Sequence, residues 1–372
     1  MAKVSKSEIL YLLFWDLIMF GKAINLDGSN EYMRFITILA MFFVFFKIFL
    51  TKMKLRELLI VCMLLVTGFL TMVFSGREGL MLSVIAVVGM KQVDISNVFK
   101  NSLIIRVVAL ISFIFLSTVG IIENQEFYDM RYGEVDVVRY GFGLGHPNLV
   151  HSYFYIIVVM FLYLYFEKVH FSHYIIIVLF NLTLYRFTCS RTGLATVFLV
   201  LVLCIILKIN RIRRFLSFWI KNIYWLCFGG VLLMIWLYDK GNPIAIYLDS
   251  MIIQGRLYGC SYYFLNYEVT LFGNQFGIES LPLDCTYIVL LLQYGVLACL
   301  IFLLISSIVV KRAWDSYNYK IVIVSVGFAI YMLFEEFGAN IFLNVSILFW
   351  GMYLFDFIEK FSMNKTKVVS RN

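Results

Sequence analysis

Three arginines stand in short motifs that lead into apolar segments. Arg139 begins the run RYGFGLGHPN, Arg191 lies in SRTG, and Arg256 lies in QGRLY. A planar guanidinium group suits phosphate oxygens because it donates two parallel hydrogen bonds. A helix that starts next to such a motif adds its free amide groups and the positive end of its dipole. If these helix ends converge, the motifs predict a site for an anion such as a pyrophosphate.

Each motif also has a simpler interpretation. The glycines that alternate before His146 allow a sharp turn as well as a close approach to a ligand, and Pro147 suits the first position of a helix. Arg191 at a membrane boundary is typical of a residue that contacts lipid phosphate, and Ser190 or Thr192 can cap the helix that follows. The three motifs therefore carry more weight as a set than singly.

His146 and Asp284 each stand just before a predicted helix. The ordinary interpretation of His146 is a polar residue at a helix-starting turn, and that of Asp284, which begins the run DCTY, is the N-cap of the next helix. Glu335 and Glu336 are adjacent, and adjacent side chains point about 100° apart on a helix. We therefore expect them to be polar interface residues and not a paired acid and base. Only Glu335 or Glu336 singly is a candidate for acid–base chemistry.

The elements that must position these residues are membrane helices. Of the 372 residues, 62% are hydrophobic and 15% are charged, against roughly 45–50% and about 25% in soluble domains. This composition predicts an all-α polytopic integral membrane protein of about twelve transmembrane helices, within a range of roughly 10 to 13. The expected spans are residues 9–21, 33–50, 58–74, 79–90, 103–122, 149–166, 174–188, 193–209, 223–238, 286–310, 321–334 and 339–358.

The net charge of +8 is explained by topology. Lys and Arg are concentrated in residues 47–56 and 208–221, and cytoplasmic segments carry such an excess. With both termini cytoplasmic, the basic residues meet anionic lipid head groups, and no nucleic acid is needed as a partner. The seven cysteines show no metal-ligand spacing, and only Cys189, Cys260 and Cys285 fall in outer segments, so at most one bridge is possible there.

The two long loops both face outward in this arrangement and contain all three prolines. Long loops in a compact protein are usually functional or disordered, so we take these loops as the working surface. No pair of helices broken at Gly or Pro is evident at matching positions, which weakens a transporter interpretation. The expected organisation is residues 1–122, helices one to five; 123–148, first outer loop; 149–238, helices six to nine; 239–285, second outer loop; 286–358, helices ten to twelve; and 359–372, cytoplasmic tail.

The ordered set RYGFGLGHPN, SRTG, QGRLY with LFGNQFG, and DCTYIVLLLQYG resembles the Wzy-type polysaccharide polymerases of the O-antigen ligase and polymerase superfamily. The resemblance covers roughly residues 130 to 310. It implies a GT-C-like membrane glycosyltransferase on the outer face of the bacterial cytoplasmic membrane. Ligases of this superfamily have His-Asn-x-Tyr where this chain has Asp284-Cys285-Thr286-Tyr287, which favours a polymerase.

The resemblance implies that the chain joins oligosaccharide repeat units, each carried on undecaprenyl pyrophosphate, into capsular polysaccharide, exopolysaccharide or O-antigen, without a metal or other cofactor. Flippase and chain-length regulator proteins are further expected partners. A ligase remains an alternative, as does a transporter or flippase of lipid-linked sugars. The roles that we expect are pyrophosphate binding by Arg139, Arg191 and Arg256, proton transfer by Asp284 or His146, and substrate contact by Asn148, Tyr258 and Tyr287.

Overall fold

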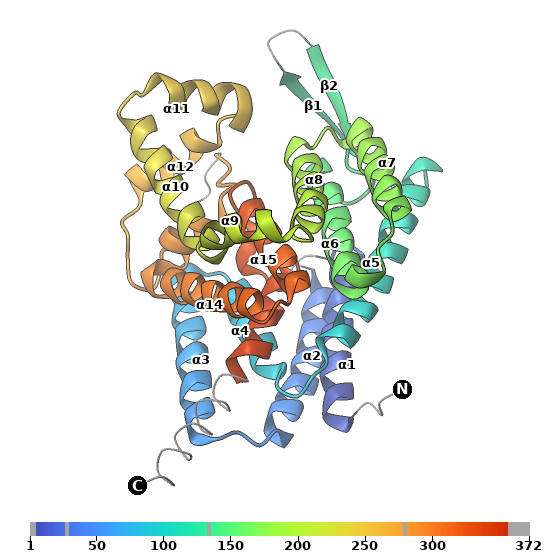
Figure 1. The fold of residues 1–372 in the computed structure, drawn as a ribbon, viewed down its shortest axis with the longest axis vertical. Coiled ribbons are helices and arrows are strands. Elements are labelled where there is room, and N and C mark those ends of the chain that lie inside the picture. The colour runs from blue at the N-terminus through green and yellow to red at the C-terminus, as the bar shows by residue number, and fades with distance from the viewer. Residues whose placement is uncertain (1–4, 27–29, 132–134, 278–280, 356–372) are drawn as a thin grey trace.

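The computed structural model describes residues 5–26, 30–131, 135–277 and 281–355, and most of this chain is helical (Figure 1). Several helices are shorter than the expected spans. In chain order the helices are α1 (Lys6–Ala23), α2 (Glu31–Leu50), α3 (Leu55–Ser75), α4 (Gly79–Gly89), α5 (Ile95–Thr118), α6 (Pro147–Tyr165), α7 (Phe171–Thr188), α8 (Arg191–Ile206), α9 (Asn210–Lys221), α10 (Ile223–Asp239), α11 (Pro243–Leu248), α12 (Arg256–Asn266), α13 (Thr286–Ile288), α14 (Gly295–Asp315) and α15 (Tyr319–Tyr331).

Five helical segments among the described residues are long and apolar enough to cross a bilayer. They are α2, α3, α5, α14 and the helix from Pro147 to Lys168 that contains α6. A sixth span is possible if α9 and α10, which are bent by 59° at their junction, are counted as one. The chain therefore has the helices of an integral membrane protein, while the number of twelve spans stays a prediction.

The two long segments predicted to be outer loops contain regular secondary structure. The first contains an antiparallel hairpin of β1 (Glu126–Arg131) and β2 (Val135–Tyr140), in which Phe127 pairs with Arg139. The sequence of β2, VDVVRY, is rich in the β-branched residues that strands favour. The second contains α11, a π-helical turn (Asp249–Ile253) and α12. Apart from this hairpin the regular structure of the described residues is helical, which is compatible with the predicted all-α membrane fold.

Helices α1 and α5 run in the same direction, as the predicted topology requires of the first and fifth spans. Glu8 accepts a hydrogen bond from Asn97 at 2.9 Å near their beginnings, and Met19 accepts one from Arg106 at 3.7 Å further along. The hairpin and α11 lie at one end of the molecule, and the basic connection between α2 and α3 lies at the other (Figure 1). The second basic segment forms α9, which crosses the middle of that view, so its side of the membrane stays a prediction.

The expected span over residues 286–310 is broken. The three-residue helix α13 passes into a π-helical turn (Val289–Gln293), and α14 starts afresh at Gly295, whose φ is +90°. The motif LFGN fills this break, because Asn274 donates hydrogen bonds to the carbonyls of Gln293 (3.2 Å, backbone) and Leu292 (2.9 Å, side chain). Two motifs of the resemblance therefore interlock and satisfy the backbone groups that the break leaves open.

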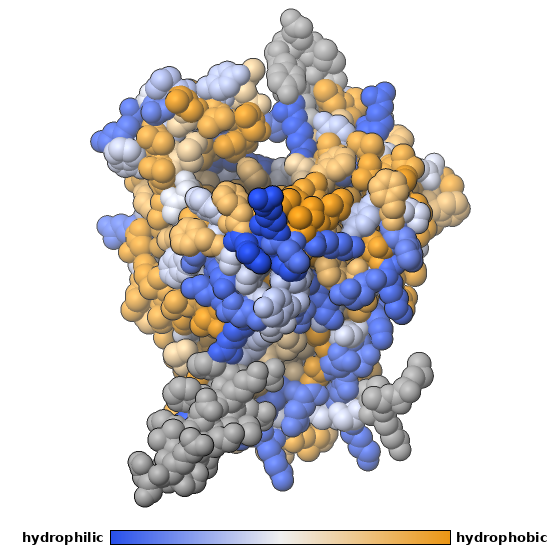
Figure 2. Space-filling model, in the orientation of Figure 1, coloured by the Kyte–Doolittle hydropathy of each residue, from blue (hydrophilic) through white to orange (hydrophobic). Residues whose placement is uncertain are grey.

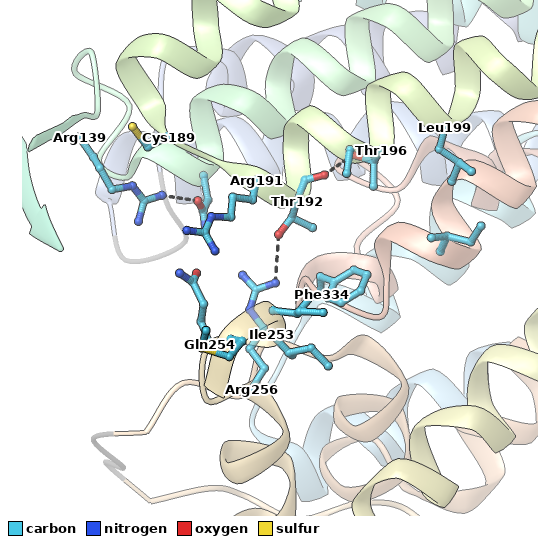
Figure 3. A pocket seen from close by; sticks show the side chains of 15 residues that line it. Arg139, Cys189, Arg191, Thr192, Thr196, Leu199, Ile253, Gln254, Arg256 and Phe334 are labelled. Carbon is cyan, nitrogen blue, oxygen red and sulfur yellow. Dashed lines mark hydrogen bonds between the residues drawn. The ribbon is translucent and has the colours of Figure 1, made fainter. Parts of the chain in front are cut away.

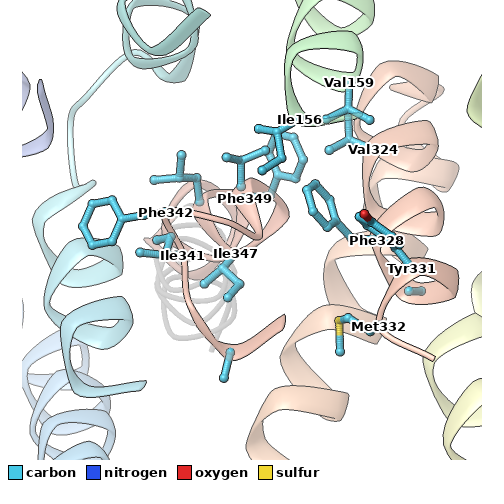
Figure 4. Packing of buried hydrophobic residues seen from close by; sticks show 14 of the residues in the cluster. Ile156, Val159, Val324, Phe328, Tyr331, Met332, Ile341, Phe342, Ile347 and Phe349 are labelled. Atoms are coloured by element: carbon cyan, nitrogen blue, oxygen red, sulfur yellow. The ribbon is translucent and has the colours of Figure 1, made fainter. Parts of the chain in front are cut away.

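The core lies where α6 and α15 meet the C-terminal segment (Figure 4). The side chains at its centre are fully buried: Ile156 and Val159 of α6 and Phe328 of α15 are each 0% exposed. The expected span over residues 339–358 is not one continuous helix, because the 3₁₀ turns Phe337–Ala339 and Val345–Ile347 interrupt it before the short helix that ends at Phe355. The expected tail over residues 359–372 lies outside the described residues.

Candidate anion-binding site

The three arginine motifs come together on one cavity of about 510 Å³. Arg139 comes from β2, Arg191 is the first residue of α8, and Arg256 is the first residue of α12. Their side chains point into the same space (Figure 3). The surface is hollowed between the part that carries α11 and α12 and the part that carries α7 and α8 (Figure 2). Helices α6, α8 and α12 thus begin around one opening.

Arg139 is fixed between three elements. Its side chain is 7% exposed. Its Nε donates to the carbonyl of Thr188 at the end of α7 at 2.9 Å, and one terminal nitrogen donates to Oδ1 of Asn148 in α6 at 2.6 Å. Because the guanidinium is rigid and planar, these two bonds fix its orientation towards the cavity. Asn148, which also lines the cavity, therefore has a positioning role.

Arg256 joins the other half of the site. One terminal nitrogen donates to the hydroxyl of Thr192 in α8 at 3.2 Å, and its Nε lies 3.4 Å from Oδ2 of Asp284. Its guanidinium also lies over the ring of Phe334, with 6.0 Å to the ring centroid. Gly255, at the N-cap of α12, has a φ of +79°, a conformation that glycine adopts without strain. The local turn therefore places this arginine at the cavity.

The lining of the cavity is polar and positive on one side and apolar on the other. Gln254 and Thr192 add neutral polar groups to the three arginines, and Leu199, Met251 and Ile330 are among the apolar residues. The described residues that line it include no acidic side chain. Opposing arginines around a concave surface raise the local positive potential, so the arrangement favours an anionic group.

Asp284 does not cap a helix. The N-cap residue of α13 is Cys285, which makes no capping bond through its side chain. Asp284 instead forms the ion pair with Arg256, and its side chain is 32% exposed. The ordinary interpretation as an N-cap is therefore wrong, and the carboxylate lies beside the arginine cavity, one contact away from it.

The other predicted residues lie elsewhere. His146 is exposed and is itself the N-cap of α6, since its Nδ1 accepts the amide of Asn148 at 3.2 Å, and its ring packs on Phe127. Tyr258 is 50% exposed and is not among the residues that line the cavity. Tyr287 is fully buried, with its hydroxyl bonded to the carbonyl of Ala329 at 2.8 Å. Tyr287 is thus a core residue in this structure, and its contact with substrate stays a prediction.

Glu335 is an acidic residue near the site that we expected from the sequence to be only a polar interface residue. Its Oε1 is buried and has no hydrogen-bond partner among the described residues. Burial raises the pKa of Glu335 to about 8, and the positive charge of Arg256 counteracts this only in part. Thr286 anchors the segment through its backbone amide, which donates to the Glu335 carbonyl at 3.0 Å. Two adjacent acids at the end of an apolar segment were the only sequence signal.

An apolar cavity of about 450 Å³ adjoins the arginine cavity and shares Ile253, Arg256 and Phe334 with it. Its other lining residues come from the end of α9, from α10 and α12, and from positions 285 and 333: they are Trp219, Ile223, Leu226, Cys227, Gly230, Val231, Met234, Leu257, Cys260, Cys285 and Leu333. The pair of cavities thus offers a cationic compartment directly beside an apolar one.

Within the described part of the chain, no three His, Cys, Asp or Glu side chains are grouped as a metal site. Comparison with family models, with curated proteins and with solved structures finds no match for this chain.

Proposed function

We propose that this protein is a polymerase on the outer face of a bacterial cytoplasmic membrane that joins oligosaccharide repeat units carried on undecaprenyl pyrophosphate. The products would be capsular polysaccharide, exopolysaccharide or O-antigen. The observation that carries the proposal is the convergence of Arg139, Arg191 and Arg256 on a cavity that adjoins an apolar one. A lipid pyrophosphate has an anionic head and a long apolar tail, which these two compartments match.

The reaction is a glycosyl transfer. A hydroxyl oxygen of the acceptor unit attacks the anomeric carbon of the growing glycan, and the bond from that carbon to the pyrophosphate oxygen breaks. Negative charge then develops on the leaving pyrophosphate, and fixed cations stabilise such charge most effectively. Arg256 and Arg191 would bind it from opposite walls, while Arg139, held by Asn148, completes the site.

The hydroxyl proton must pass to a base within hydrogen-bond reach. Asp284 is our first candidate, because its ion pair with Arg256 places a carboxylate at the edge of the pyrophosphate site. The exposed Tyr258 is a candidate for sugar contact. His146 is the less favoured base, since it caps α6 and is not among the described residues that line the cavity.

A transporter or flippase of lipid-linked sugars is the second candidate. The break at Gly295 and the turns after Phe337 are interruptions of the kind that transporters place at their substrate sites. A ligase would use the same arginine cavity with a different acceptor. The arginine cavity therefore supports a ligase as well as a polymerase.

An assay in which purified protein is supplied only with a synthetic repeat unit on undecaprenyl pyrophosphate distinguishes the polymerase, the ligase and the transporter. A polymerase yields a ladder of glycan lengths and releases undecaprenyl pyrophosphate. A ligase yields product only when a foreign acceptor is added. A transporter in vesicles moves the lipid-linked unit between leaflets with the unit unchanged, and that result would overturn the proposal.

A deletion strain provides the cellular test. Loss of long polysaccharide with retention of single-repeat material is the expected result, and the flippase and chain-length regulator that we expect as partners should remain functional in that strain. Normal chain lengths in the deletion strain would contradict the proposed function.

A further inference from the structure

Two cysteines, Cys260 and Cys285, line the same apolar cavity. Cys260 is on α12, one helical turn after Arg256, and Cys285 directly follows Asp284. Both residues are buried, at only 3% and 2% exposed. The segments that carry them pack closely, because a Cβ added at Gly259 would lie 2.7 Å from the carbonyl oxygen of Pro282. The Arg256–Asp284 ion pair links the same two segments.

The two thiols are not equivalent. The hydrogen bond from Cys260, two backbone amides of α13 and the charge of Arg256 lower the pKa of Cys285, although burial opposes this. The same hydrogen bond, burial and the carboxylate of Asp284 raise the pKa of Cys260. Because the thiolate is the nucleophile in thiol–disulfide exchange, Cys285 is the attacking group and Cys260 is the resolving one.

The pair can be reached by small molecules in spite of its burial. Both cysteines line the apolar cavity of about 450 Å³, together with Cys227 of α10. In the predicted topology Cys260 and Cys285 themselves fall in outer segments, where disulfides persist. Neither thiol is exposed enough to meet a thiol of another protein directly, so an intramolecular product is favoured.

We propose that Cys260 and Cys285 form a reversible disulfide that ties α12 to the start of α13 beside the arginine cavity. The Cys285 thiolate attacks one sulfur of a small external disulfide and releases a thiolate. The sulfur of Cys260 then loses its proton and attacks the mixed disulfide at Cys285, and the second half of the reagent leaves. The pair loses two electrons and two protons, and the external disulfide becomes two thiols.

The bridge would lie next to the ion pair between Arg256 and Asp284, where Nε and Oδ2 are 3.4 Å apart. Arg256 and Cys260 are four residues apart on α12 and so share one face of that helix. Oxidation would hold Arg256 at the cavity even when the ion pair opens. The bridge would form whichever ligand the cavity binds.

The test counts thiols in the full-length protein in detergent. Reduced protein, denatured and alkylated with a maleimide, should carry adducts on all seven cysteines. After treatment with hydroxyethyl disulfide and removal of the reagent, it should carry two adducts fewer. Proteolysis should then release one cross-linked peptide pair that contains Cys260 and Cys285, and a dithiol should restore the full count.

Matched variants locate the pair. Cys260→Ala and Cys285→Ala should abolish the loss of two adducts, whereas Cys189→Ala and Cys227→Ala should preserve it. The wild-type measurement decides by itself if a variant does not fold. An unchanged count after oxidation, a mixed disulfide at Cys285 that never resolves, or a bridge that uses Cys227 would each overturn the proposal.

Discussion

Glu335→Gln tests whether a partly buried acid beside the arginine cavity is held in its neutral form. Burial raises the pKa of Glu335 from 4.5 to about 8. Between these two values the folded protein binds a proton that the unfolded chain has released. Folding stability must therefore fall as the pH rises through this range and level off above the folded pKa.

The size of the effect follows from the shift. One pKa unit corresponds to about 1.4 kcal/mol, so at about pH 7.5, roughly three units above 4.5, the acid costs at most ~4 kcal/mol. Water around the partly exposed Glu335 reduces this figure. Glutamine resembles the neutral acid and titrates nowhere in the range. Glu335→Gln should therefore match the wild type below the ordinary glutamate pKa and be clearly more stable near neutral pH.

Thermal or denaturant unfolding of the purified protein, followed by tryptophan fluorescence across this pH range, measures the difference. Glu336→Gln is the matched control. Glu336 is exposed, so this substitution should change the pH profile less. If the wild type and Glu335→Gln keep a constant separation from acid to neutral pH, Glu335 is ionised in the folded protein and the reasoning fails. Lost transfer activity in the more stable variant would mark a functional acid.

Three further substitutions test the site and the fold. Arg256→Lys should reduce glycan transfer strongly although the charge is kept, because the two parallel hydrogen bonds of the guanidinium are lost. Arg186→Lys, at an exposed position of α7, is the matched control. Equal chain lengths from both variants would mean that Arg256 only contacts lipid. Asp284→Asn should leave protein abundance nearly unchanged, since a partly exposed ion pair contributes about 0–1 kcal/mol. Its transfer rate should fall by about 10² to 10⁴ if Asp284 is the base, and a rate within about threefold of wild type excludes that role. Gly295→Ala should destabilise the protein, because a Cβ at this φ of +90° would overlap the backbone of Gly273, so an unchanged unfolding midpoint would contradict the interlocked break.

Composition and short local patterns determined the class of the protein. The high apolar content and the length of the apolar runs indicate a membrane environment, and the described residues include five or six helices able to cross it. The glycine and proline positions correctly indicated that a helix starts at Pro147. These features depend on neighbours along the chain, so no knowledge of the fold was needed to read them.

Only the tertiary structure decided what lies next to what. Arg256 meets Thr192 and Asp284 through contacts between segments distant in sequence, and Thr286 holds the backbone of Glu335 in the same way. Such contacts depend on how helices pack, which helical periodicity does not specify. The same limit explains Tyr287, which the DCTY motif suggested as a substrate contact. Its role follows from burial against α15, because a buried hydroxyl needs a partner and finds one in a core carbonyl.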